Sequence, residues 1–130
     1  MDDRPIVLDA SALLALLNDE AGAAAVAALL PRVSMCAVNL AEVVGKLAEH
    51  GMPEPAIRSA VDALGIAVVG FGHEKAYQCG MLRPNTKRLG LSLGDRACIA
   101  LGREISARVV TADRTWAQLE ESVDVEVIRR

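Results

Sequence analysis

The chain has 130 residues, of which 52% are apolar and only 2% are aromatic. This length suits one domain, residues 1–130, and the composition requires a core built from Ala, Val, Leu and Ile side chains. The formal net charge of −3 excludes a protein that attracts nucleic acid over its whole surface, so a nucleic-acid partner would need a local basic patch.

Three cysteines lie inside apolar segments, and this odd number argues against a disulfide framework. No Cys-x-x-Cys pair or Cys/His cluster indicates a zinc site. The first residues are acidic and polar, unlike a signal peptide, and the Ala-rich stretch from Ala21 to Leu30 is far shorter than the ~20 residues that a membrane span needs. These features predict a cytoplasmic protein with reduced cysteines and no membrane partner.

Apolar periodicity and turn residues predict strands that alternate with helices along the whole chain. Strands are expected at residues 5–9, 34–38, 66–71, 107–111 and 123–128, the last with the alternation of an edge strand. Helices are expected at residues 11–20, 21–30, 39–51, 53–65, 73–82, 95–106 and 113–121, and a loop at residues 83–94. Such alternation is typical of an α/β fold, in which helices cover both faces of a parallel sheet.

Four acidic residues follow predicted strands or open the helices after them. They are Asp9 at the end of the first strand, Glu42 in the first turn of the helix after the second, Asp95 at the start of the helix after the loop, and Asp113 after the fourth strand. Each has a local explanation, because acids cap helices and both Asn39-x-x-Glu42 and Ser92-x-x-Asp95 resemble capping boxes. The carboxyl ends of parallel strands meet at one edge of a sheet, however, so the four acids can also converge there.

Four converging carboxylates need a positive partner. Two carboxylates about 4 Å apart repel by roughly 4 kcal/mol at an effective dielectric near 20, and four of them form several such pairs. The cluster must therefore take up protons or bind a cation. Oxygen ligands favour a hard ion, Mg²⁺ or Mn²⁺, and an ion that keeps several waters suits phosphodiester hydrolysis.

The segments that carry the acids are, in order, "IVLDASALLALL", "VNLAEV", "SLGDRACIALG" and "VVTADRTW". Together they resemble the acidic motifs of the PIN-domain nucleases, most closely those of the VapC-type ribonuclease toxins of bacterial toxin–antitoxin pairs. The resemblance extends from Ile6 to the last strand. It implies a three-layer α/β/α domain, usually with sheet order 3-2-1-4-5, and a Mg²⁺-dependent endoribonuclease that leaves a 5′-phosphate and a 3′-hydroxyl.

The resemblance also implies roles for single residues and partners. The catalytic, metal-binding acids would be Asp9, Glu42, Asp95 and Asp113, with Ser11 and Thr111 as supporting hydroxyls. Proteins of this kind are usually homodimers that a VapB-type antitoxin neutralises, its C-terminal segment wrapping the cleft. We hypothesise that metal-activated water attacks phosphorus in line and that the metal stabilises the leaving 3′-oxygen.

A cleft with this negative charge repels RNA, so cations must line its rim. The candidate RNA-binding residues are Arg83, Lys87, Arg88, Arg96 and Arg114, the last two directly after site acids. The alternative is ordinary solubilising charge.

Other side chains are interpreted structurally. His50 and His73 are expected at the surface, and Trp116 is expected to be packed rather than stacked on a base. The apolar helices at residues 21–30 and 56–64 either pack on the core or form a dimer or antitoxin groove.

Other functions fit the residues less well. A phosphatase of the haloacid dehalogenase type also has an Asp after its first strand, but it needs Asp-x-Asp, and here the second position is Ser11. A dinucleotide-binding module would need a Gly-rich turn, which "DASALL" lacks. A catalytically weak or inert PIN-fold binding module stays open as an alternative, although the four intact acids argue against it.

Overall fold

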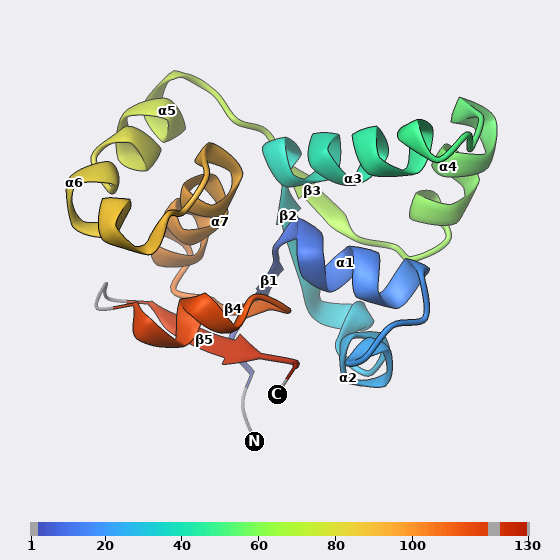
Figure 1. Cartoon of the computed structure of the whole chain (residues 1–130), viewed down its shortest axis with the longest axis horizontal. Helices are drawn as coiled ribbons and strands as arrows, with labels where there is room; N and C mark the ends of the chain where they lie inside the picture. The colour runs from blue at the N-terminus through green and yellow to red at the C-terminus, as the bar shows by residue number, and fades with distance from the viewer. Residues whose placement is uncertain (1–2, 120–122, 130) are drawn as a thin grey trace.

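The computed structural model describes residues 3–119 and 123–129 and contains a five-stranded parallel sheet (Figure 1). Its strands are β1 (Ile6–Leu8), β2 (Val33–Cys36), β3 (Ala67–Val69), β4 (Arg108–Thr111) and β5 (Asp124–Val127). Across the sheet their order is β3-β2-β1-β4-β5, and each neighbouring pair is parallel. The predicted order 3-2-1-4-5 is confirmed, and so is the position of the last strand at an edge.

Helices cover both faces of the sheet. They are α1 (Ala10–Leu17), α2 (Ala23–Ala27), α3 (Ala37–Glu49), α4 (Glu54–Asp62), α5 (His73–Gly80), α6 (Arg83–Thr86) and α7 (Leu93–Glu104), with 3-10 turns η1 (Leu30–Arg32), η2 (Lys87–Leu89) and η3 (Arg114–Gln118). Helices α1–α4 lie on one face and α5–α7 on the other, which confirms the three-layer α/β/α architecture (Figure 1). Within the described ranges, each helix falls short of the length and apolar character that crossing a membrane requires.

Strand β1 divides the core into two halves because its side chains alternate between the faces. Val7 packs in the layer of α5–α7, beside Val109 of β4 and Ile99 of α7. Ile6 and Leu8 pack in the layer of α1–α4. All three β1 side chains are at most 1% exposed, as expected for a central parallel strand with helices on both sides.

The prediction of a loop at residues 83–94 was wrong, because most of this segment lies in α6, η2 and the start of α7. Pro84 lies in the first turn of α6, where its missing N–H leaves no helical hydrogen bond unmade. Gly90, with φ of 68°, has the left-handed conformation that ends η2. The prediction thus took a proline at a helix start for a helix breaker.

Several predicted elements are shorter in the structure. The Ala-rich helix predicted at residues 21–30 is reduced to α2, which buries Val26 and leaves most of its alanines exposed. Helix α4 buries Ile57 and Val61, so core packing is confirmed for α4 but limited in α2. The helix predicted at residues 113–121 is the turn η3, and residues 120–122 lie outside the described ranges.

The contact between α7 and β4 leaves no room for a side chain at Gly102, where a Cβ would overlap Cγ2 of Val109. We expect Gly102→Ala to lower the free energy of unfolding by about 1–3 kcal/mol, because overpacking outweighs the ~1 kcal/mol that Ala gains over Gly within a helix. The control is Gly45→Ala in α3, where an added Cβ would meet no other part of the described structure within 4 Å. It should stabilise the protein by up to ~1 kcal/mol. Urea unfolding followed by Trp116 fluorescence measures both, and effects of equal sign would contradict the close packing.

Candidate functional site

Two of the four acids follow strands of the sheet, and the other two, Glu42 and Asp95, lie near the starts of α3 and α7. Asp9 comes directly after β1, and Asp113 comes two residues after β4. The chain runs from β1 to β2 and β3 on one side and returns to β4 on the other, so the strand order reverses between β1 and β4. Ligands of open parallel sheets bind at such a reversal, next to the carboxyl ends of the strands.

Asp9 is the buried centre of this site, with 3% of its surface exposed. Its Oδ1 accepts hydrogen bonds from the Ala12 amide and the Ser11 hydroxyl, both at 2.8 Å. Its Oδ2 accepts a hydrogen bond of 2.5 Å from the Thr111 hydroxyl. The pairing of β1 with β4 brings Thr111 to Asp9 across 102 positions of the chain. The two predicted hydroxyl residues therefore contact Asp9 directly.

The same two hydroxyls also accept hydrogen bonds from the turn after β4. Ser11 Oγ accepts from the Ala112 amide at 2.9 Å, and Thr111 Oγ1 accepts from the Asp113 amide at 3.0 Å. The Asp113 carboxylate then caps η3 by accepting from the Thr115 amide at 2.9 Å. One hydrogen-bonded network thus joins the start of α1 to the end of β4.

Asp95 lies in the first turn of α7 and forms the predicted capping box with Ser92. Its Oδ2 accepts from the Ser92 amide at 2.9 Å, and its own amide donates to Ser92 Oγ at 3.1 Å. Cap and site are compatible interpretations for this residue, since a capping carboxylate can keep a free lone pair.

Glu42 does not form the capping box that was predicted with Asn39. Helix α3 begins at Ala37, with Cys36 at the N-cap, so Glu42 lies in the second turn rather than the first. The Asn39 side chain points along the helix instead. Its Nδ2 donates to Glu42 Oε1 and to the carbonyl oxygen of Gly94, both at 3.0 Å. The spacing of three residues that suggested a capping box also places Asn39 and Glu42 on one helix face, and the structure shows this second arrangement.

The charge of Asp95 acts on two of the other acids. The pKa of Asp9 is raised from its ordinary 3.8 to about 6, and burial is the main cause. The hydrogen bonds from Thr111, Ala12 and Ser11 lower this pKa, and the charge of Asp95 raises it. Burial likewise raises the pKa of Glu42, whose carboxyl group lies against α7 although the residue as a whole is exposed. The hydrogen bond from Asn39 lowers that pKa, and the charge of Asp95 raises it. Asp95 is therefore within electrostatic range of both other carboxylates.

Comparison with known proteins identifies the family. Residues 6–122 match the PIN domain. The chain belongs to the PIN domain family. The fold of this PIN domain is similar to solved structures of DNA-bound VapBC from Salmonella typhimurium (TM-score 0.72, 16% identity, 95% of this chain and 97% of that chain) and VapBC-1 from nontypeable Haemophilus influenzae (TM-score 0.70, 18% identity, 94% and 96%). VapBC2 from Rickettsia felis, bound to a promoter DNA fragment, is also similar (TM-score 0.70, 15% identity, 93% and 96%). No curated protein matches this chain.

The acids of this PIN domain fit a hydrated divalent cation better than a closed metal cage. PIN nucleases generally use divalent metal ions. In residues 3–119 and 123–129, no three Asp, Glu, His or Cys side chains are grouped closely enough to enclose a metal. Mg²⁺, however, is commonly held by one or two carboxylates and several waters. Burial is the main cause of the raised pKa values of Asp9 and Glu42, and the charge of Asp95 adds to both. A bound cation would oppose both effects, because it favours ionised carboxylates.

The predicted basic residues divide into a surface group and one buried residue. Arg83, Lys87 and Arg88 are exposed on α6 and η2, and Arg114 is exposed on η3. The Arg88 guanidinium donates to the Gln118 carbonyl at 3.5 Å, so η2 lies next to η3.

The prediction that Arg96 lies at the rim of the acidic cleft was wrong. It is only 7% exposed, and its guanidinium donates to the Leu91 carbonyl at 3.0 Å inside the α7 layer. Residues that follow each other in a helix point about 100° apart, so proximity to Asp95 in sequence does not place Arg96 at the same surface.

The remaining side chains agree with their structural interpretations. His50 and His73 are exposed, and Trp116 is buried. Ser11 occupies the position where a haloacid dehalogenase needs its second acid, and its hydroxyl donates a hydrogen bond to Asp9. This contact and the family assignment remove that alternative.

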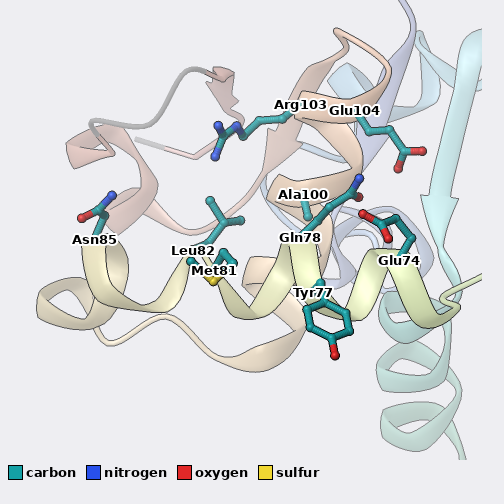
Figure 2. Close-up of a pocket in the computed structure, with 9 residues that line it drawn as sticks. All are labelled: Glu74, Tyr77, Gln78, Met81, Leu82, Asn85, Ala100, Arg103 and Glu104. Atoms are coloured by element: carbon teal, nitrogen blue, oxygen red, sulfur yellow. The ribbon is translucent and has the colours of Figure 1, made fainter.

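A pocket of about 650 Å³ lies apart from the acids, between α5, α6 and α7 (Figure 2). It is lined by Glu74, Tyr77, Gln78, Met81, Leu82, Asn85, Ala100, Arg103 and Glu104. None of the four acids is among them, so this pocket is a separate surface feature.

The raised pKa of Asp9 makes the stability of the metal-free protein depend on pH. The ordinary pKa of 3.8 applies when the chain is unfolded, and the value of about 6 applies when it is folded. The folded state therefore favours protonated Asp9, so its contribution is fully present below the unfolded pKa and is lost as the pH rises through 6. Asp9→Asn removes this titration. In EDTA, the free energy of unfolding of the wild type relative to D9N should fall by roughly 2–3 kcal/mol between about pH 4 and pH 7.

Urea unfolding of both proteins at a series of pH values measures this difference, and the subtraction cancels the titration of shared groups. A difference that stays constant across the range would show that the Asp9 charge is already compensated. Mg²⁺ at neutral pH should stabilise the wild type more than D9N, because a cation favours the ionised carboxylate.

Proposed function

We propose that this chain is a divalent-metal-dependent endoribonuclease, with Mg²⁺ or Mn²⁺ as its cofactor, and the toxin of a type II toxin–antitoxin pair acting in the cytoplasm. The observation that carries the proposal is that the charge of Asp95 acts on both Asp9 and Glu42 in a PIN domain, and that Asp113 is joined to Asp9 through Thr111. Solved structures of similar fold are toxin–antitoxin complexes, which supports the biological setting.

The four acids would hold the metal, and the neighbouring groups would keep them in place. When bound, such an ion lowers the pKa of a water and stabilises negative charge on the phosphate. Asp9 is held by three hydrogen-bond donors, so its carboxylate is preorganised rather than free to rotate. Asp95 is fixed by its capping box on α7. The chain thus supplies rigid oxygen ligands on the ends of separate elements.

The RNA strand would be held by the exposed cations of α6, η2 and η3. Arg83, Lys87, Arg88 and Arg114 are exposed residues of these three elements, and η2 contacts η3 through Arg88 and Gln118. The whole chain is acidic, so RNA binding depends on this local positive charge. Phosphate contacts of this kind position the strand without reading its sequence.

A VapB-type antitoxin and a second copy of the chain are the proposed protein partners. An apolar groove of about 410 Å³ between α3 and α4 offers a surface for such contacts. It is lined by Leu40, Val44, Ala48, Met52, Glu54, Ile57, Arg58, Val61 and Asp62. The exposed alanines of α2 add a second apolar surface on the same layer.

The nuclease proposal is tested by incubating purified, antitoxin-free protein with total RNA, with Mg²⁺ or with EDTA. We expect discrete fragments with Mg²⁺ and none with EDTA. Asp95→Asn should reduce cleavage by at least about 100-fold, since even residues that only support metal ligands cost 10- to 100-fold. Asn can still accept the Ser92 amide hydrogen bond, so α7 keeps its cap.

The matched control is Glu49→Gln, which removes an exposed carboxylate from the end of α3, outside the groove. It should cleave like the wild type. If neither wild type nor control cuts RNA at any Mg²⁺ or Mn²⁺ concentration while both stay folded, the catalytically inert binding module becomes the better account.

The basic surface is tested in the D95N background, which prevents cleavage during the measurement. Affinity for single-stranded RNA is measured by fluorescence anisotropy over a series of KCl concentrations. Lys87→Ala should lower the slope of log K against log salt by about 0.7, the value for one lost phosphate contact with a single strand. Arg58→Ala is the control, because this arginine pairs with Glu54 on α4 at 2.7 Å. An unchanged slope for Lys87→Ala would remove η2 from the RNA surface.

A further inference from the structure

Asn39 is a buried polar residue whose hydrogen bonds join two of the elements that carry site acids. It is 1% exposed, within α3. Its Nδ2 donates to Glu42 Oε1 on its own helix and to the Gly94 carbonyl oxygen on α7. Its Oδ1 is buried and has no hydrogen-bond partner among the residues that the structure describes. The two bonds that its NH₂ group donates are therefore the side-chain hydrogen bonds that hold Asn39 among these residues.

The chemistry of the two partners fixes the orientation of the amide. Both are oxygen acceptors, a carboxylate and a carbonyl, so only the NH₂ group of Asn39 can bond to them. Each of its two hydrogens has one partner. An aspartate of the same shape would present an acceptor to two acceptors, and an alanine would present nothing.

Gly94 completes the contact from the side of α7. A Cβ at this position would overlap the carboxyl group of Glu42, so that group lies directly on the bare backbone of α7. Gly94 is 55 positions from Asn39 and immediately precedes Asp95. The amide that holds Glu42 is thus bonded to the residue next to Asp95, and the absent side chain of Gly94 allows the approach.

We propose that Asn39 is a positioning residue that, together with Gly94, sets the Glu42 carboxylate against Asp95 for metal binding. The inference rests on the proposed function, because it assigns a purpose to Glu42 as a ligand. Asn39 itself contacts neither the ion nor RNA. Its effect passes through Glu42, and this dependence can be measured.

The first measurement is the affinity of the antitoxin-free protein for Mn²⁺, taken from the free-ion electron paramagnetic resonance signal without RNA. Asn39→Ala should weaken Mn²⁺ binding by about 10- to 100-fold, the usual cost of losing a group that orients a metal ligand. Asn39→Asp should lose at least as much, and Asn39→Ser, which keeps one donor, should recover part of the loss. Gly94→Ala should also weaken binding, although it leaves Asn39 in place.

The matched control is Val43→Ala, which makes a cavity in the core on the same helix without touching the acids. It should lower the thermal stability and leave the Mn²⁺ affinity unchanged. If Asn39→Ala does not fold, Gly94→Ala carries the test. With Mn²⁺ in excess, Asn39→Ala should lower kcat for RNA cleavage and leave KM for RNA unchanged.

A double-mutant cycle with Glu42→Ala separates positioning from a general structural effect. If Asn39 and Gly94 act through the Glu42 carboxylate, then Asn39→Ala and Gly94→Ala should each change Mn²⁺ affinity by no more than about twofold in the Glu42→Ala background. Losses of equal size in both backgrounds would overturn the inference. So would wild-type Mn²⁺ affinity in both single variants. If the wild type binds no Mn²⁺ and cuts no RNA, the proposed function fails, and the positioning role fails with it.

Discussion

The structure of the site depends on keeping the carboxylate of Asp9 buried at the end of the central strand. Burial of an ionisable group is unfavourable, and here it is partly offset by the Ala12 amide and the hydroxyls of Ser11 and Thr111. These donors come from α1 and β4, so satisfying one carboxylate requires that both elements lie against the end of β1. The same hydroxyls accept amide hydrogens from the turn after β4, which fixes the backbone that carries Asp113.

The parallel sheet explains how the other acids reach this point. Each β–α connection returns the chain to the same edge, so the helices after β2 and before β4 begin or pass close to Asp9. Three of the acids also stabilise local backbone, since Asp9, Asp95 and Asp113 each cap a helix or turn. Capping fixes the carboxylates, and their mutual repulsion would favour a cation at the proposed site. Structural and chemical roles therefore reinforce each other in the same residues.

The sequence predicted most of the fold and the approximate place of the site, because buried strands and the acids after them are local signals. It failed where the decisive contact lies far along the chain. Helix α3 starts at Ala37 after a cysteine without a side-chain cap, so no polar residue marked the boundary and Asn39 was read as the cap. Its true partner, Gly94, belongs to another helix. The prediction that Arg96 binds RNA failed for a similar reason, since tertiary contacts decide which face of α7 packs inward.

The contact between Ser11, Asp9 and Thr111 has a consequence for the time at which the site forms during synthesis. Strands β1 and β2 leave the ribosome early and can pair, but the partner of β1 on its other side is β4, near the end of the chain. Until β4 emerges, Asp9 lacks the Thr111 hydroxyl, and Asp113 has not been made. A chain that ends before Asp113 therefore has an incomplete set of acids, and any activity that needs all four is confined to chains translated beyond Asp113.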